Sequence, residues 1–153
     1  MSELNQALLA PCGLYCGVCA IYIAHRDNNL KFKERLVNVY KPISNSIDDI
    51  KCNGCLSEEI VFGYCQSCSI KSCVKEKNID GCFQCDDWPC KFIDGFPIPV
   101  GKKVIMRAIP QWRELGTEQW VKREEERYHC LCGNPLFRGA KRCNNCGNTV
   151  NVD

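Results

Sequence analysis

The chain has 153 residues, 15 of which are cysteine, and a formal net charge of +2 at pH 7. This length excludes a full parallel α/β barrel, which needs about 250 residues, and fits one domain with a small additional module. The first residues lack the basic segment and apolar run of a signal peptide, and no stretch is apolar enough to cross a membrane, so we expect a cytoplasmic protein. Thiols stay reduced there and an odd number of cysteines cannot all pair, which favours bound metal over disulfides.

Bound metal would also change the charge of this chain, because a metal-bound cysteine is a thiolate. Each zinc ion held by four thiolates contributes a net negative charge, so that several such sites would make the whole protein negative. Nucleic-acid binding through overall electrostatic attraction is therefore not predicted.

The first group of cysteines has the spacing C-x3-C-x2-C and consists of Cys12, Cys16 and Cys19. This spacing can supply three corners of an iron–sulfur cluster, or ordinary zinc ligands. Its fourth ligand stays open: another cysteine, His25, a carboxylate or a small molecule.

Two helices are expected after this group. The segment AIYIAHRDNN predicts a short helix that ends near Asp27. A second helix is predicted with Asn28 or Asn29 as its cap, and Pro42 limits its length. Four residues with helical spacing form the apolar face of this second helix: Phe32, Leu36, Val39 and Tyr40.

Residues 52–90 are too rich in cysteine and too poor in aliphatic residues to bury a conventional core, so metal must supply much of their folding free energy. Their eight cysteines are Cys52, Cys55, Cys65, Cys68, Cys73, Cys82, Cys85 and Cys90. The first four could close one site and the last four a second, but an interleaved pairing fits the spacing equally well.

The segments CGLYCGVCAIY, CNGC and YCQSCSIKSCVKEKNIDGCFQCDDWPC resemble the prokaryotic family called domain of unknown function 3795. The resemblance covers about residues 10–95. It implies a metal-binding protein, a cytoplasmic setting and a prokaryotic source, and it carries no established activity with it.

Residues 96–128 are predicted to be a linker and helices. Val104, Ile105, Ala108 and Ile109 favour a short helix that ends before Pro110. Thr117 is expected to cap a further helix from Glu118 to about residue 128. The apolar face of this helix holds Trp120, Val121 and Tyr128.

The last segment, YHCLCGNPLFRGAKRCNNCGN, is typical of a zinc ribbon, in which two tight turns each present two ligands to one tetrahedral zinc ion. The predicted ligands are Cys130, Cys132, Cys143 and Cys146. Gly133 and Gly147 follow the second ligand of each turn, where glycine permits a positive φ. The first turn is C-x-C instead of C-x2-C, so His129 is an alternative ligand to Cys130.

These patterns predict a small metal-stabilised α+β protein with N-terminal helices and zinc-finger-like knuckles in a cysteine-rich metal-binding domain (1–95). Connecting helices (96–128) and a C-terminal zinc ribbon (129–153) follow. We expect about three to four zinc ions.

Three hypotheses of function follow. The first is a non-catalytic interaction or regulatory module that binds a protein partner. The second is an iron–sulfur or redox protein with a [4Fe-4S] cluster at Cys12, Cys16 and Cys19. The third is a nucleic-acid binder that uses the basic ribbon loop, although no interleaved aromatic residues accompany its cations. These cations are Arg138, Lys141 and Arg142.

Overall fold

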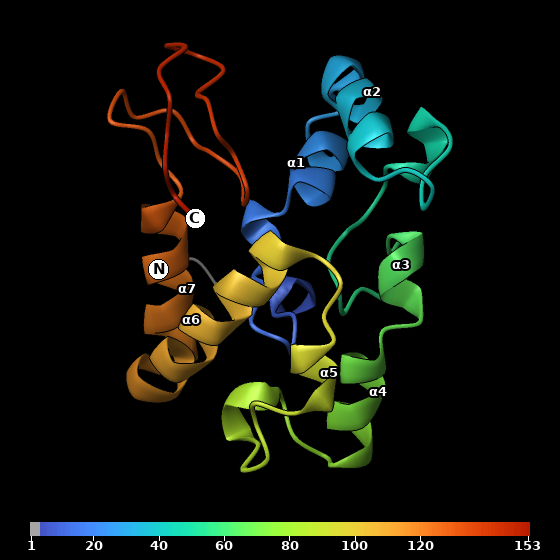
Figure 1. The fold of residues 1–153 in the computed structure, drawn as a ribbon, viewed down its shortest axis with the longest axis vertical. Helices are drawn as coiled ribbons and strands as arrows, with labels where there is room; N and C mark the ends of the chain where they lie inside the picture. The colour runs from blue at the N-terminus through green and yellow to red at the C-terminus, as the bar shows by residue number, and fades with distance from the viewer. Residues whose placement is uncertain (1–3) are drawn as a thin grey trace.

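The computed structural model describes residues 4–153, and helices supply most of their regular structure (Figure 1). The α-helices are α1 (Ala20–Arg26), α2 (Leu30–Val39), α3 (Gly63–Gln66), α4 (Ser69–Glu76), α5 (Lys91–Asp94), α6 (Pro99–Leu115) and α7 (Thr117–Arg127). Short 3-10 helices are η1 (Gln6–Leu8), η2 (Cys16–Val18), η3 (Ile47–Asp49) and η4 (Cys82–Gln84). Within residues 4–153, no helix is both long enough and apolar enough to span a membrane.

The β structure of residues 4–153 consists of two isolated antiparallel bridges near the C-terminus. One joins His129 with Pro135 and the other joins Arg142 with Thr149. The protein is therefore small and mostly helical, and the β part of the expected α+β fold is limited to these bridges.

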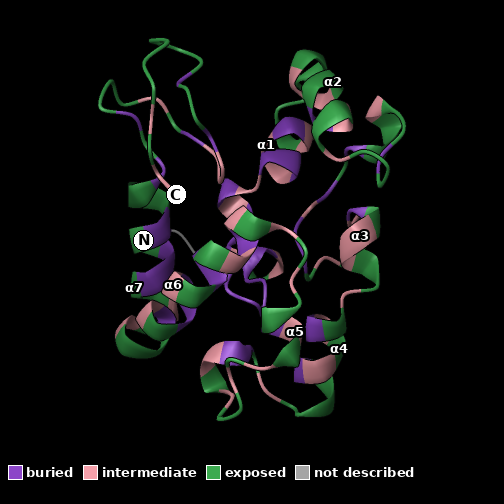
Figure 2. Cartoon of the chain, viewed as in Figure 1, coloured by how far each residue is buried: buried purple, intermediate pink, exposed green. Residues whose placement is uncertain are grey.

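Helices α1 and α2 form a pair after the first cysteines. Of the predicted apolar face of α2, Leu36 is buried, whereas Val39, in the last turn, is exposed. α2 begins after Asn29, whose side-chain oxygen accepts the N–H of Phe32 at 3.1 Å, so Asn29 and not Asn28 is the cap. Buried Leu36 and Phe62 belong to a small core at this pair. This core lies apart from the main one, which gathers where α6 and α7 meet the N-terminal segment (Figure 2).

Helix α6 runs through Pro110, and the prediction that it ends before this residue was wrong. Proline removes one helical hydrogen bond and costs about 3 kcal/mol in a helix interior. Pro110 is exposed, whereas the next turn brings Trp112 into the core, where it is 2% exposed. The ring of Trp112 stacks on Trp120 at 4.0 Å and on Phe83 at 4.2 Å between centroids. Truncating such a residue typically costs about 3–5 kcal/mol, which offsets the cost of the proline.

Helix α7 follows α6 after a single glycine and folds back on it. Gly116 precedes the helix with a φ of 79°, and Thr117 is the first helical residue instead of the predicted cap. The Thr117 hydroxyl accepts a hydrogen bond from Trp112 Nε1 at 2.9 Å, so it ties the two helices together. Trp120, Val121 and Tyr128 are buried, as their shared face predicts.

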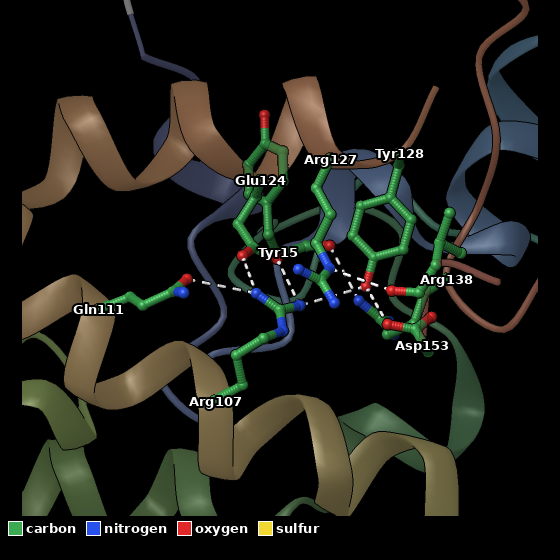
Figure 3. Close-up of polar contacts among 9 residues, drawn as sticks. Tyr15, Arg107, Gln111, Glu124, Arg127, Tyr128, Arg138 and Asp153 are labelled. Atoms are coloured by element: carbon green, nitrogen blue, oxygen red, sulfur yellow. Dashed lines mark hydrogen bonds and ion pairs between the residues drawn. The ribbon is translucent and has the colours of Figure 1, made fainter. Parts of the chain in front are cut away.

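A buried ion pair also joins α6 to α7 (Figure 3). Glu124 is 1% exposed, and its Oε1 lies 2.5 Å from Nη1 of Arg107. Arg107 also donates from Nη2 to the hydroxyl of Tyr128 at 3.4 Å. The Tyr128 hydroxyl in turn donates to Oδ1 of Asp153 at 2.7 Å, which brings the C-terminal segment into the same network.

The C-terminal segment contacts the N-terminal part of the chain directly. The backbone N–H of Arg138 donates to the oxygen of Val18 at 2.8 Å, and its Nη1 donates to the oxygen of Tyr15 at 3.0 Å. The neighbouring Phe137 ring lies 5.0 Å from the Phe32 ring on α2. The segment between the two cysteine pairs is therefore held against η2 and α2, although it is far from them in sequence.

Candidate metal centre

The structure brings together the four cysteines of the C-terminal segment. The sulfur atoms of Cys130, Cys132, Cys143 and Cys146 all lie within 4.8 Å of one another. The Cys130 and Cys146 sulfurs are 3.6 Å apart, and those of Cys132 and Cys143 are 3.8 Å apart. Four thiolates at such distances could hold one metal ion between them.

Two turns of similar geometry present these cysteines. The N–H of Cys130 donates to the oxygen of Asn134 at 2.9 Å, and the N–H of Cys143 donates to the oxygen of Asn148 at the same distance. Each turn thus places its first cysteine opposite the asparagine of a Cys-Gly-Asn sequence. The same backbone hydrogen bond therefore closes both turns.

Glycine closes each turn in the conformation that the sequence predicts. Gly133 has a φ of 90° and donates its N–H to the oxygen of Cys130 at 2.8 Å. Gly147 has a φ of 76° and donates to the oxygen of Cys143 at 2.9 Å. A side chain would strain this left-handed backbone, which explains why glycine follows the second cysteine of each pair.

Backbone N–H groups in these turns favour the thiolate form that a metal needs. The N–H of Cys146, followed by that of Asn145 and by neighbouring thiols, lowers the pKa of Cys143 to about 6. The N–H of Asn134, followed by the side chain of Asn145, lowers the pKa of Cys132. The site therefore stabilises negative charge on its sulfurs by local backbone geometry.

His129 does not belong to this group of four. Its Nδ1 lies 2.8 Å from the backbone oxygen of Glu125 in the last turn of α7, and the residue is exposed. Cys130, which is buried, supplies the sulfur instead. The other histidine, His25, is half-buried near the end of α1 and joins no metal-sized group within residues 4–153.

Cysteines of the first group lie among those of the middle segment, so that Cys52, Cys55, Cys65 and Cys68 do not stand apart as one set. The N–H of Cys55 donates to the sulfur of Cys16 at 3.3 Å. Burial raises the pKa of Cys12, and the neighbouring thiols of Cys68 and Cys16 raise it further. Cys12, Cys16, Cys55 and Cys68 thus form one neighbourhood.

Cys19 packs in a different cluster from Cys12 and Cys16, although Cys16 lies near enough to this cluster for its charge to act on Cys65. Cys19 packs with Cys52 and Cys65 against the small core of α1 and α2. Burial, and then the thiols of Cys19, Cys16 and Cys52, raise the pKa of Cys65 to about 12. Cys12 therefore belongs to the first set and Cys19 to the second, and Cys16, the first residue of η2, lies near both.

The last four cysteines of the middle segment form a third set. Burial, followed by the thiols of Cys85, Cys90 and Cys73, raises the pKa of Cys82 to about 12. All four of these cysteines line one cavity between α4, η4 and α5. This third set agrees with the pairing in which the last four cysteines belong together.

Two cationic side chains to which the sequence assigns no role at the N-terminal cysteines, Lys71 and Arg138, act on these cysteines. Lys71 on α4 donates to the backbone oxygens of Cys55 at 2.6 Å and Cys65 at 3.1 Å. The pKa of Cys16 is lowered to about 7, first by its hydrogen bonds with Cys55 and then by the charges of Arg138 and Lys71. The sequence places Arg138 in the basic ribbon loop and gives Lys71 no role, so neither is predicted to act on Cys16.

Arg138, Lys141 and Arg142 do not form one exposed surface. Arg138 is partly buried and turns toward Tyr15, whereas Lys141 and Arg142 are exposed. The basic loop therefore presents two of its three expected cations to solvent.

A comparison with protein-family models gives a match to more than half of the chain. The family model described as "Protein of unknown function (DUF3795)" matches residues 8–95. No curated protein and no solved structure matches the chain. The match includes all three N-terminal sets of cysteines and ends before α6, so the C-terminal group of four lies outside it.

Proposed function

We propose that this chain, which belongs to the DUF3795 family, is a metal-stabilised interaction or regulatory module whose C-terminal four cysteines bind zinc. The observation that carries the proposal is the spacing of the four sulfurs. A tetrahedral zinc ion with Zn–S bonds of about 2.3 Å places neighbouring sulfurs about 3.8 Å apart. The pairs at 3.6 and 3.8 Å fit this geometry closely.

The donor set also favours zinc and a structural role. Soft thiolates in a tetrahedral arrangement are typical of zinc, and four protein ligands leave no open coordination position for a substrate. A closed site of this kind supplies folding free energy and not chemistry. We therefore expect no catalysis at these cysteines.

The position of the site supports a role in holding the chain together and presenting a surface. The segment between the two cysteine pairs carries Phe137 and Arg138, which contact α2 and η2. At the outer turn, Leu131 between Cys130 and Cys132 is fully exposed. We expect bound zinc to fix both contacts, and we expect Leu131 to contact a protein partner.

No specific observation supports either alternative function at the residues that the sequence assigns to it. A cluster held by Cys12, Cys16 and Cys19 together is disfavoured because Cys19 packs with another set. Nucleic-acid binding by the ribbon loop is disfavoured because Arg138 is engaged with Tyr15.

Metal content per chain tests the proposal. The full chain is purified without oxygen, and zinc and iron are measured in the parent protein, in Cys146→Ser and in Asn151→Ser. We expect Cys146→Ser to lose one zinc per chain and Asn151→Ser, an exposed position outside the cysteine pairs, to lose none. Unchanged zinc in Cys146→Ser, or a loss of iron in its place, would refute zinc at this site.

Cobalt substitution tests the closed, non-catalytic character of the site. Cobalt bound by four thiolates gives visible bands whose pattern depends on the ligands. We expect these bands to stay the same when imidazole or cyanide is added, because the metal has no open position. A spectral change on addition would indicate an exchangeable ligand and would overturn the non-catalytic assignment.

A further inference from the structure

The four cysteines of the third set line a cavity, and their sulfurs do not gather at one position. Cys73 lies on α4, Cys82 and Cys85 lie at η4, and Cys90 precedes α5. All four line the same cavity, which has a volume of about 200 Å³. The remaining wall is mainly apolar, and its apolar members are Ile70, Val74, Ile79, Trp88, Phe92 and Ile93.

The sulfurs of this set are farther apart than those of the C-terminal four. In any three of Cys73, Cys82, Cys85 and Cys90, at least one pair of sulfurs is more than 4.8 Å apart. One zinc ion would hold all four sulfurs at about 3.8 Å from one another. In a [4Fe-4S] cluster each thiolate binds a different iron, so the sulfurs stand farther apart around a core of iron and sulfide. These sulfurs are not gathered for one ion, and the apolar cavity that they line leaves room for such a core.

A charged donor lies at one of these sulfurs. Nζ of Lys77, in the turn that ends α4, donates to Sγ of Cys85 at 3.2 Å and to Oδ2 of Asp87 at 2.8 Å. Hydrogen bonds to ligand sulfurs and nearby charge are the means by which proteins set the potential of iron–sulfur clusters. Lys77 is therefore in position to stabilise added negative charge on a cluster.

A buried donor without an acceptor lies in the same wall. The indole Nε1 of Trp88 is buried and has no hydrogen-bond partner among residues 4–153. Trp88 lines the cavity, and the guanidinium of Arg113 lies 5.3 Å from the centre of its ring. Buried N–H groups are nearly always satisfied, and the sulfide and thiolate sulfurs of a cluster are acceptors.

Arg113 also holds the loop that carries two of the cysteines. It donates from Nη2 to the backbone oxygen of Cys85 at 2.6 Å and from Nε to that of Phe83 at 2.9 Å. This arginine belongs to α6, which is part of the main core. The cysteine loop is thus fixed from outside the cavity, so that the cavity does not depend on a bound metal alone.

We propose that Cys73, Cys82, Cys85 and Cys90 bind a [4Fe-4S] cluster in this cavity, with Lys77 hydrogen-bonded to the Cys85 ligand and Trp88 donating to the cluster. The proposal is independent of zinc at the C-terminal four, because the two sets share no ligand. It places iron–sulfur chemistry at residues other than the first three cysteines.

Anaerobic reconstitution of the full chain with ferrous iron and sulfide tests the proposal. We expect cysteine-dependent binding of iron and acid-labile sulfide in equal amounts, with broad absorbance near ~400 nm. One electron from dithionite should reduce the cluster and give a paramagnetic signal. We expect Cys85→Ser and Cys73→Ser to lose this absorbance while keeping the zinc of the C-terminal group, which shows that the chain is still folded.

A matched substitution at the other site separates the two proposals. Cys132→Ser should lose zinc at the C-terminal group and keep the iron absorbance. A colourless protein in which Cys85→Ser loses one zinc would overturn the cluster assignment. Iron absorbance that survives in full in Cys85→Ser would also overturn it, since the cluster would then belong to other cysteines.

Variants that leave every cysteine in place test the geometry of the cavity. Lys77→Met removes the charged donor at Cys85, and Lys75→Met removes an exposed charge from the same helix. We expect Lys77→Met to lower the midpoint potential of the cluster and Lys75→Met to leave it unchanged. Equal potentials in the two variants would contradict the placement of Lys77 at the cluster.

Discussion

The guanidinium of Arg138 donates a hydrogen bond to the backbone oxygen of Tyr15 at 3.0 Å, across 123 positions of the sequence. The backbone N–H of the same arginine donates to Val18, at the other end of η2. The C-terminal segment is therefore anchored to both sides of the turn that carries Cys16. The positive charge of Arg138 also favours the thiolate form of Cys16.

Replacing Arg138 should weaken the contact between the C-terminal segment and η2. In Arg138→Met we expect the free energy of unfolding to fall by about 1–3 kcal/mol, the range for a hydrogen bond made by a charged group. Urea denaturation of the metal-loaded chain measures the change. Arg142→Met, at an exposed position, is the control and should change stability by less than about 0.5 kcal/mol. Equal effects in the two variants would mean that the contact with Tyr15 adds no stability.

The buried pair of Arg107 and Glu124 predicts a larger effect. In Arg107→Met the carboxylate of Glu124 stays buried without its partner, which typically costs about 3–5 kcal/mol. Replacing both residues with methionine should recover much of this loss, because no charge is then left buried. Thermal unfolding of the two variants measures the difference. A double variant as unstable as the single one would show that packing, and not the unpaired charge, controls stability here.

Gly54 is the residue of the cysteine-rich segment that should tolerate a side chain least. It has a φ of 121°, and an added Cβ would lie 2.3 Å from the backbone oxygen of Ala7. Its N–H also donates to the sulfur of Cys52 at 3.3 Å. We expect Gly54→Ala to reduce stability by more than about 2 kcal/mol and to lower the metal content of the N-terminal sets.

Gly63 supplies the matched control for this substitution. It begins α3, and an added Cβ there meets no atom within 4 Å. Gly63→Ala should raise stability by about 0.4–1 kcal/mol, because it restricts the unfolded chain without strain in the folded one. Metal content and denaturant midpoints are measured for both variants. Similar losses of stability and metal in the two variants would contradict the clash at Gly54.

The carboxylate of Asp49 should titrate at lower pH than an ordinary aspartate, which has a pKa of about 3.9. The N–H groups of Asn45 and Ser46 donate to it at 2.8 and 3.2 Å, and they lower its pKa. Because the folded pKa is depressed, the resulting stability is present above the unfolded pKa and is lost as the pH falls through the folded value. Asp49 therefore stabilises the turn at η3 at neutral pH.

The amide resonances of Asn45 and Ser46, followed by NMR against pH, report this titration directly. We expect a midpoint below about 3.9 and its disappearance in Asp49→Asn. Asp48→Asn changes the neighbouring carboxylate and should leave the transition in place. A midpoint at or above the ordinary value would show that these hydrogen bonds do not form in solution.

Local patterns in the sequence predict local structure well. The position before an amphipathic segment limits the cap of α2 to Asn28 or Asn29, and the structure has Asn29. The positive φ of Gly133 and Gly147 follows from turns that bring two cysteines together. The four cysteines of residues 130–146 assemble as predicted because short loops connect them.

Features that depend on distant segments could not be predicted in the same way. The spacing of the first cysteines is compatible with several groupings, and only the packing of distant segments places Cys19 with Cys52 and Cys65. Pro110 normally ends a helix, and the burial of Trp112 beyond it overrides that preference. Arg138 belongs to a basic loop in the sequence, but its contact with Tyr15 depends on how the two ends of the chain meet.

The stack of Phe83, Trp112 and Trp120 gives the protein an internal optical reporter. Phe83 lies between Cys82 and Cys85, which both line the cavity, and its ring is parallel to that of Trp112 within 12°. Trp120 continues the stack into α7, which leads directly to the C-terminal cysteines. Metal binding at the third set or at the C-terminal four therefore acts near the same two indole rings, Trp112 and Trp120. Their natural fluorescence can follow metal loading in real time without an attached dye.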